Sequence, residues 1–343
     1  MKIGMVPRAA PRCFAAGLAL WLAVIIPSVA ASEDERLTFF RIGTGPTAET
    51  LYALGTAISA GISRPPGSSP CDQGGVCGVP GLIAVAQSKG GSIENLEALA
   101  EGDLESALVH ADMAYWAYNA AGPFKHRRPF TALRVIANLT PVSMHIVVPA
   151  ESGIRAIQDL KGKRVSLGPS GSGTVSNALL LMRTHGLSLE EFRPRFLNPG
   201  PASDQLASGE IDALFEIGGE PIEAVAALAE RMPIRLIPIG GYPARQMQSL
   251  YPFLSAGVIR DGLYNGVPET ATLSLGVQWV TRSEEPSGLV ESITRALWQG
   301  NSRELYLIDN PDSRFPTLEE AARESAVPMH AGAKVYYDQV TGS

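Results

Sequence analysis

Hydrophobic and polar positions follow one another along the chain in an order that predicts strands, glycine-rich loops and helices in turn. Short β-rich runs at 39–42 and 164–167 are each followed by such a loop. Each loop then opens a helical pattern, the first of them over 47–62. Strands that alternate with helices in this way are typical of α/β folds built on a parallel sheet.

The rest of the chain continues this pattern. Further strands are predicted at 82–85, 107–109, 133–139, 145–149, 214–215 and 272–281, and further helices begin at Ser92 and cover 286–298 and 318–325. One helix–turn–strand unit occurs twice, because Leu99–Ser106 matches Leu206–Ala213 in position and chemistry. Such turns are common in α/β proteins, so the match alone is compatible with coincidence. The glycine-rich loops precede both copies in the same order, and we therefore expect two related lobes.

The order of these elements predicts how two lobes divide the chain. We expect lobe I to comprise residues 31–149 and 253–343, and lobe II to comprise residues 150–252. The chain after residue 30, about 310 residues, exceeds the ~250–300 residues at which single cores stop growing. Two strands that cross between the lobes would form a hinge whose closure buries a ligand.

The N-terminus has the three-part pattern of a secretory signal peptide. Residues 1–12 carry three basic side chains and no acidic one, an apolar run covers 13–26, and small residues follow at 28–31. The alternative is a retained membrane anchor, but the apolar run is shorter than the ~20 residues of a spanning helix. We therefore expect residues 1–30 to be a cleaved signal peptide and the mature protein to be periplasmic.

Composition and charge narrow the classes of partner. The chain carries 28 Lys and Arg against 34 Asp and Glu, which gives a net charge of -6. Removal of residues 1–30 takes away three positive charges and leaves a net charge of -9. Nucleic acid and anionic lipid both bind basic faces, so the sequence argues against them as partners.

The mature sequence keeps two cysteines, Cys71 and Cys77, in a stretch rich in proline and glycine. In an exported protein this pair predicts a disulfide that closes a small loop. A metal site is the weaker alternative, since the spacing is C-x5-C with no histidine nearby. We expect no cofactor and no metal.

The two glycine-rich loops are the candidate binding elements. They are Gly43–Thr47 and Gly168–Thr174, and both combine glycines with hydroxyl side chains. Backbone N–H groups and hydroxyls at a helix N-terminus suit an anion or a polar small molecule. Simple N-capping is the alternative, but it needs one hydroxyl, whereas Ser170, Ser172 and Thr174 supply three. Two such loops, one in each lobe, predict a ligand held in a cleft.

Enzymatic chemistry fits these residues poorly. Gly168–Gly173 has the glycine spacing of a phosphate-binding loop, but Thr174 stands where the phosphate-gripping lysine would be. The sequence has no G-x-S-x-G elbow, and its five histidines show no metal-ligand spacing. We therefore expect a binding protein and not an enzyme. One of the histidines, His110, follows a predicted buried strand and either lines the cleft or is structural.

Short motifs in a fixed order make the chain similar to a known family. They are Gly43-Thr44-Gly45, Gly90–Leu96, Ala111–Tyr115, Leu160–Ser166, Ser170–Thr174 and Tyr251-Pro252-Phe253. Together they resemble the TAXI family, the solute-binding subunits of tripartite ATP-independent periplasmic (TRAP) transporters. The resemblance covers essentially the whole mature chain and ends at Val327–Ala333.

The resemblance implies an α/β, two-lobed type II periplasmic-binding-protein fold with a ligand cleft between the lobes and no catalysis. It implies capture of a small organic solute, a carboxylate or an amino acid, and delivery of that solute to the membrane subunits of a TRAP transporter. Contact with the membrane partner would be peripheral. The sequence leaves open the alternative of a ligand-sensing periplasmic receptor for a membrane signalling protein.

The resemblance also implies a set of ligand-binding residues in both lobes. By position they are Gly43, Thr44, Thr47, Tyr52, Gly91, Ser92, Asn95, Asp112, Ser170, Gly171, Ser172, Gly173, Thr174 and Asn177. The segment after the predicted strand at 214–215 adds Gly219 and Glu220, and the start of the first helix adds Glu49.

Three acidic residues, Glu49, Glu216 and Glu220, depart from the family pattern. One hypothesis is that they select a ligand with a positive group, such as an amino acid, over a plain dicarboxylate. The alternative is that Glu49 only complements the helix N-terminus and that the other two face solvent. The first hypothesis expects glutamate to bind better than 2-oxoglutarate in calorimetric titration.

Overall fold

The computed structural model describes residues 37–342 with the exception of 48, 70, 74, 76 and 312. The segment Arg36–Ser343 forms one compact unit. The predicted signal peptide lies outside the described residues. Within them, none of the helices combines the length and the apolar character that crossing a membrane requires.

The first part of the chain forms the β1 lobe, which we name after its central strand. Its elements are β1 (Thr38–Thr44), α1 (Thr50–Ile62), β2 (Ser63–Arg64), β3 (Val79–Pro80), β4 (Leu82–Ser88), α2 (Ser92–Glu101), β5 (Ser106–His110) and α3 (Ala111–Asn119). β1 lies between β4 and β5 and is parallel to both. The predicted alternation of strands and helices is confirmed, although α1 begins only at Thr50, after a turn in which Glu49 N donates to Pro46 O.

A second group of elements forms the β9 lobe, again named after its central strand. Its elements are β7 (Arg164–Ser166), α4 (Gly173–Thr184), β8 (Arg193–Arg195), α5 (Pro199–Ala207), β9 (Ala213–Gly218), α6 (Glu223–Arg231), β10 (Ile234–Leu236) and α7 (Gly241–Leu250). β7 is parallel to β8 and to β9. Successive side chains of β9 enter different apolar layers, since Phe215 lies in the core cluster with α4 and Leu214 in the one with α5 and α6.

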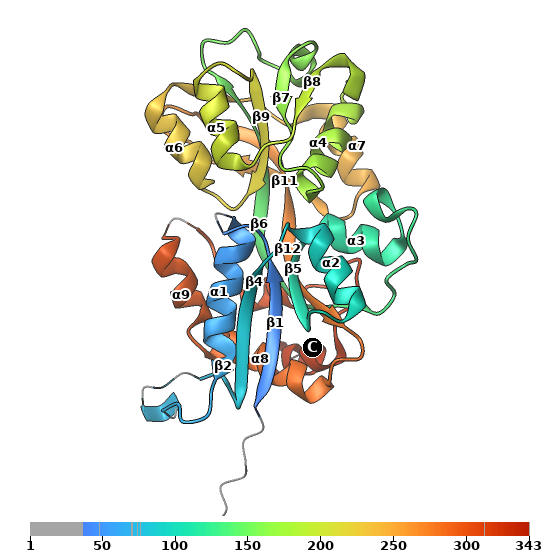
Figure 1. Cartoon of the computed structure of the whole chain (residues 1–343), viewed down its shortest axis with the longest axis vertical. Helices are drawn as coiled ribbons and strands as arrows, with labels where there is room; N and C mark the ends of the chain where they lie inside the picture. The colour runs from blue at the N-terminus through green and yellow to red at the C-terminus, as the bar shows by residue number, and fades with distance from the viewer. Residues whose placement is uncertain are drawn as a thin grey trace, which may run out of the picture. The chain divides into compact units, whose positions relative to one another are not determined.

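Two long strands run through both lobes (Figure 1). β6 (Leu133–Pro149) is antiparallel to β12 (Thr270–Arg282), and its last residues are also antiparallel to β9 and β10. β12 is antiparallel to β5 near its C-terminal end and to β11 (Leu254–Ile259) near its N-terminal end. One mixed sheet therefore has the order β4-β1-β5-β12-β6-β9-β7-β8, with β10 paired to β6 and β11 paired to β12, whereas β2 and β3 form a separate two-stranded sheet. The predicted two-lobed α/β class is confirmed, and the residue boundaries of the lobes stay a prediction.

β6 differs from the prediction, because the sequence indicated two strands, at 133–139 and 145–149. The structure joins them through Pro141, which pairs with Gly276 where the register shifts between Gly276 and Gln278. Proline lacks the N–H that a regular ladder requires, and such an irregularity tolerates it.

The C-terminal part of the chain returns to the β1 lobe. Its helices are α8 (Ser287–Gln299), α9 (Ser302–Asp309), α10 (Leu318–Ala321) and α11 (Ala331–Thr341). Both α8 and α9 pack on α1, and α11 packs on α8. The helix predicted over 318–325 ends early, at Ala321, and Asn138 Nδ2 donates to the carbonyl groups of Ala321 and Arg323 beyond it.

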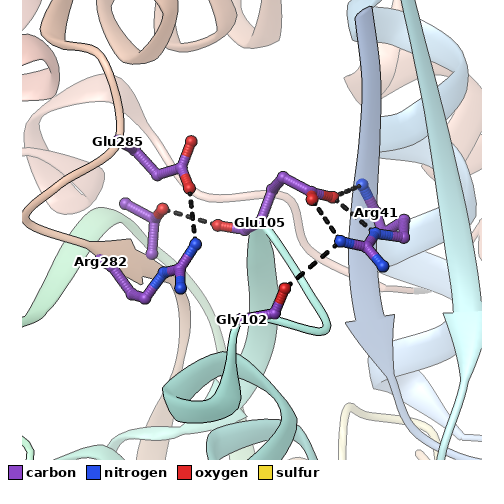
Figure 2. A network of polar contacts seen from close by, with 6 residues as sticks. Arg41, Gly102, Glu105, Arg282 and Glu285 are labelled. Carbon is purple, nitrogen blue, oxygen red and sulfur yellow. Dashed lines mark hydrogen bonds and ion pairs between the residues drawn. The ribbon is translucent and has the colours of Figure 1, made fainter.

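The repeated unit has the same polar contact in both lobes. In the β1 lobe, Arg41 N and Nε donate to Glu105 Oε2 at 2.6 and 2.9 Å, and the guanidinium also reaches Oε1 at 2.5 Å (Figure 2). In the β9 lobe, Arg164 N and Nε donate to Asp212 Oδ2 at 2.7 and 3.0 Å, and the guanidinium reaches Oδ1 at 2.7 Å. Each acid directly precedes a buried strand, so the contact ties β1 to its parallel neighbour β5 in one lobe and β7 to its parallel neighbour β9 in the other.

A disulfide joins Cys71 and Cys77, whose Cα atoms lie 4.7 Å apart. The pairing predicted from the sequence is therefore confirmed. The bridge closes its loop between β2 and β3, which pair in parallel.

Candidate functional site

A cavity of about 570 Å³ lies at the carboxyl ends of strands from both lobes. Ligands of open α/β sheets bind in this position, because the loops that follow the strands converge there. The β1 lobe contributes the start of α1 and His110 at the end of β5. The β9 lobe contributes the end of β9 and the first residues of α5 and α6. Three residues of the C-terminal part, Tyr306, Asn310 and Ser313, complete the wall.

Glu216 contributes a buried carboxyl group to the cavity. It lies on β9 opposite His145 of β6, and 5% of its surface is exposed. Burial, and then the nearby charge of Glu49, raise the pKa of Glu216 to about 8. The hydrogen bond that it accepts from Ile217 N is long, at 3.4 Å. The alternative in which Glu216 faces solvent is therefore wrong.

Glu49 brings a second carboxyl group into the same cavity. It occupies the N-cap position of α1, but its side chain makes no capping hydrogen bond to the described residues. The carboxyl group instead folds back over Gly45, where a β-carbon would lie 2.7 Å from Glu49 Oε2. Burial raises the pKa of Glu49 to about 7. Glu49 therefore lines the cavity and makes no capping hydrogen bond to the described part of the helix; its contact with a ligand stays a prediction.

His110 forms the part of the wall that belongs to β5. Its backbone N–H donates to Ser92 Oγ at 3.0 Å. The ring is buried, its Nδ1 has no hydrogen-bond partner among the described residues, and burial lowers its pKa to about 4. The imidazole of this lining residue is therefore neutral, and its Nδ1 is buried without a partner among the described residues.

Three helices begin at the cavity: α1, α5 and α6. Thr50, Gly200 and Ala224, which line it, belong to their first turns. The first turn of a helix carries N–H groups without intrahelical acceptors and a partial positive charge. The cavity thus combines helix ends that stabilise an anion with two carboxyl groups.

Hydrogen bonds between the lobes hold the walls of the cavity. Gly219 N donates to Thr50 Oγ1 at 2.9 Å. Ser313 Oγ donates to the backbone carbonyl of Glu220 at 3.3 Å. These bonds fix the end of β9 against the start of α1 and against the segment after α9.

A second contact between the lobes joins α3 to α4, where Asn177 Nδ2 donates to Asp112 Oδ2 at 2.5 Å. Both side chains are buried, and the other carboxylate oxygen of Asp112 has no partner among the described residues. Burial raises the pKa of Asp112 to about 7, although the bond from Asn177 acts in the opposite direction.

A buried chain of hydrogen bonds supports the wall at the start of α6. Ile222 N donates to Tyr264 OH at 2.9 Å, and this hydroxyl lies 3.0 Å from His145 Nε2. His145 Nδ1 lies 3.0 Å from the carbonyl of Ser143, and burial lowers the pKa of His145 to about 4. A neutral ring that donates from Nδ1 accepts at Nε2, so Tyr264 donates to it.

The structure brings three of the predicted site residues, Thr47, Glu49 and Gly219, into the wall of the cavity. The others lie outside this lining: Gly43, Thr44, Tyr52, Gly91, Ser92, Asn95, Asp112, Ser170, Gly171, Ser172, Gly173, Thr174, Asn177 and Glu220. Some of their side chains form hydrogen bonds with the backbone. Asn95 Nδ2, for example, donates to the carbonyls of Thr44 and Leu108. A direct contact between any predicted residue and a ligand stays a prediction.

The second glycine-rich loop is used within the fold. Ser172 Oγ accepts from Val175 N at 3.3 Å and caps α4. Gly173 lies against α3, because a β-carbon there would be 3.2 Å from Met113 Cγ. Ser170 and Gly171 are exposed, whereas Thr174 is buried.

Sequence reasoning missed polar residues of the wall, namely Asn198, Tyr306, Asn310 and Ser313. The one available signal was Asn198-Pro199-Gly200, since proline in the first turn marks a helix start after a strand. The other three come from α9 and the segment after it and belong to no motif. No group of three or more His, Cys, Asp or Glu side chains in the described part of the chain is arranged to hold a metal ion.

Solved structures with a similar chain trace include three solute-binding proteins. The alkanesulfonate-binding protein SsuA from Xanthomonas axonopodis pv. citri, bound to MOPS, is 18% identical over 90% of this chain and 80% of that chain, with a TM-score of 0.48. The periplasmic aliphatic sulphonate binding protein SsuA from Escherichia coli is 15% identical over 89% and 90%, with a TM-score of 0.48. A TctC solute binding protein from Polaromonas is 14% identical over 91% and 100%, with a TM-score of 0.49.

A sequence comparison identifies the family to which this chain belongs. The model of the NMT1-like family matches residues 42–340, which include every element of both lobes that lines the cavity. Members of this family are binding proteins. The chain therefore belongs to the NMT1-like family, within the periplasmic-binding-protein superfamily.

Proposed function

We propose that this protein is a periplasmic solute-binding receptor of the TAXI type. It captures a small organic solute, a carboxylate or an amino acid, and delivers it to the membrane subunits of a TRAP transporter. The observation that carries the proposal is the cavity at the carboxyl ends of strands from both lobes. Membership of the NMT1-like family supports solute binding, and the signal-peptide pattern of residues 1–30 supports the periplasmic location.

The architecture suits reversible capture. The walls come from two lobes joined by β6 and β12, so movement of the lobes about these strands would open and close the cavity. The first turns of α1, α5 and α6 supply partial positive charge for a carboxylate without a fixed cation. Such an anion is held by hydrogen bonds and dipoles that it can leave without breaking an ion pair.

Two measurements test capture. Native mass spectrometry of protein purified under mild conditions should detect a retained organic solute. Thermal-shift screening of organic acids and amino acids should reveal ligands that raise Tm, because a ligand that binds the folded state stabilises it.

A cavity-filling variant shows whether such a ligand binds in this cavity. Gly200 lines the cavity as the second residue of α5, and a β-carbon there meets no heavy atom within 4 Å. Gly200→Trp should therefore be tolerated at its β-carbon, and its indole should occupy the cavity and abolish the thermal shift. Gly288→Trp is the matched control, since Gly288 is the second residue of α8, equally open, and outside the lining. If Gly200→Trp responds like the wild type, the cavity is not the binding site.

Delivery is tested separately, by solute uptake into vesicles that contain the TRAP membrane subunits. Uptake should depend on the receptor and should be lost with Gly200→Trp. Retained binding without any uptake would favour the sensing receptor over the transport receptor.

A further inference from the structure

The charged groups that face the cavity are of one sign. Its titratable side chains are Glu49, His110, Glu216, Glu223 and Tyr306, and the described lining contains neither lysine nor arginine. Among the described residues, the carboxyl groups of Glu49 and Glu216 belong to no ion pair. Two poorly compensated carboxyl groups therefore share one cavity.

Such a pair is unfavourable for the protein alone. Burial raises the pKa of both groups, to about 7 for Glu49 and about 8 for Glu216, and the charge of Glu49 contributes to the second value. A positive charge between them would reverse this effect, since an opposite charge favours the ionised form of an acid. Perturbed acids in a cleft are candidate binding groups for this reason.

His110 lines the same wall and is a second observation that points to a ligand. The residue is 8% exposed, and its side chain makes no hydrogen bond among the described residues. Burial keeps the ring neutral, so one of its nitrogens is an acceptor that would not repel an ammonium group.

We propose that Glu49 and Glu216 form a cation-binding pair that selects a solute with a protonated amine, and that the neutral ring of His110 accepts a hydrogen bond from the same group. The inference rests on the proposed function and specifies its solute. The carboxylate of the solute lies at the helix N-termini, and its amine lies at the carboxyl pair. The competing arrangement is one in which both acids are protonated and donate to a plain carboxylate.

Matched probes that differ only at the amine separate these arrangements. They are L-glutamate with 2-oxoglutarate, L-alanine with pyruvate, and 4-aminobutyrate with butyrate, each measured by thermal shift and by calorimetry. The amine-bearing member of a pair should bind at least tenfold more tightly. If only the amine-free members bind, the inference is overturned and the receptor function stands. If no probe in either group gives a shift that Gly200→Trp abolishes, the receptor function itself fails for these solute classes, and the inference fails with it.

Charge-neutral variants test the two residues directly. Glu216→Gln and Glu49→Gln keep the size of the side chain, and each should weaken binding of the amine-bearing probe at least tenfold. Glu230→Gln, at an exposed position of α6 outside the lining, should leave binding unchanged. Unchanged or tighter binding by Glu216→Gln would assign the protonated, donating role to this group and overturn the proposal.

The sign of the proton exchange gives a readout that a merely structural role would not produce. At pH 7.5 an amine that binds to the two acids should release protons, whereas a carboxylate that binds to their protonated forms should take protons up. Calorimetry in two buffers with different ionisation enthalpies measures this exchange. Proton release that disappears in Glu216→Gln supports the pair, and proton uptake overturns it.

Discussion

The two glycine-rich loops share a strand-to-helix plan but serve different ends. In the β9 lobe, Ser172 caps α4 with its hydroxyl, and Gly173 packs against Met113. In the β1 lobe, the N-cap residue of α1 is Glu49, whose carboxyl group leaves the helix end and lines the cavity. The loop at Gly168–Thr174 therefore makes its contacts within the fold, whereas the loop at Gly43–Thr47 leads to a side chain that lines the cavity.

This difference shows that a glycine-rich loop does not by itself define a binding site. Serine, threonine, aspartate and asparagine stabilise a helix at the N-cap, and glutamate does so poorly. Glu49 makes no capping hydrogen bond, and its carboxyl group lies over Gly45. We infer that its side chain was not retained for helix stability. The identity of the cap residue, more than the number of glycines, therefore distinguishes the two loops.

The largest expected effect comes from alanine at a glycine of each loop. Gly168 has a φ of +95°, and a β-carbon there would lie 2.9 Å from Thr174 Cβ, so Gly168→Ala should lower the free energy of unfolding by about 3 kcal/mol. At Gly45 the nearest atom is the flexible end of Glu49, so Gly45→Ala should lower it by less than about 1 kcal/mol. Urea denaturation of both variants measures these losses. Equal losses would remove the structural distinction between the loops.

The pH dependence of stability should reveal the acids on the cavity side of this comparison. Burial raises the pKa of Glu49 and Asp112 to about 7 and that of Glu216 to about 8, so these groups bind protons more tightly in the folded state. Stability should therefore fall between pH 6.5 and 8.5, by at least about 2 kcal/mol for the three groups together, since one pKa unit corresponds to about 1.4 kcal/mol. The buried histidines His110 and His145 act in the opposite direction, but only below pH 6.5.

Urea denaturation at a series of pH values measures this slope. Glu216→Gln should flatten it, and Glu230→Gln, which changes an exposed acid of α6, should not. A wild-type slope that is flat or rises between pH 6.5 and 8.5 would contradict the burial of these acids.

Local pattern was enough to predict most of the elements. The strand before the first glycine loop and the helix after it, the helix starting at Ser92 and the repeated unit ending before β5 and β9 all follow from short-range periodicity and turn chemistry. Glu49 and Glu216 were also visible in the sequence, because they stand where relatives of the resembled family have other residues. Pattern left open whether they face solvent, and burial excludes this for Glu216.

The rest depended on contacts between distant segments. Tyr306 and Asn310 reach the cavity only because α9 is placed there by packing, and their own sequence surroundings carry no trace of it. The sequence around Pro141 indicated a break between two strands. The structure accommodates this proline by a register shift in the pairing with β12, which lies far along the chain and leaves no local signal. Long-range register of this kind is fixed by tertiary packing and not by local preference.

The arginine–carboxylate contacts are a feature that the two lobes share. Arg41 with Glu105 and Arg164 with Asp212 repeat the same three hydrogen bonds. Both pairs are partly exposed, so Glu105→Gln and Asp212→Asn should each lower the free energy of unfolding by about 1.5 kcal/mol. Urea denaturation should give losses that agree within about 0.5 kcal/mol. A clear loss of stability for only one of the two variants would show that the contacts have the same geometry but contribute differently to stability.

The smallest expected effect tests the cap residues themselves. Ser172→Ala removes a hydroxyl that satisfies the first turn of α4, so it should lower the free energy of unfolding by about 1 kcal/mol. Glu49→Ala removes no capping bond and relieves a buried carboxyl group, so at pH 8 it should leave stability unchanged or raise it. Differential scanning fluorimetry without added solute compares the two Tm values with that of the wild type. If Glu49→Ala is destabilised as much as Ser172→Ala, the Glu49 side chain supports the helix after all, and the two loops differ in sequence but not in use.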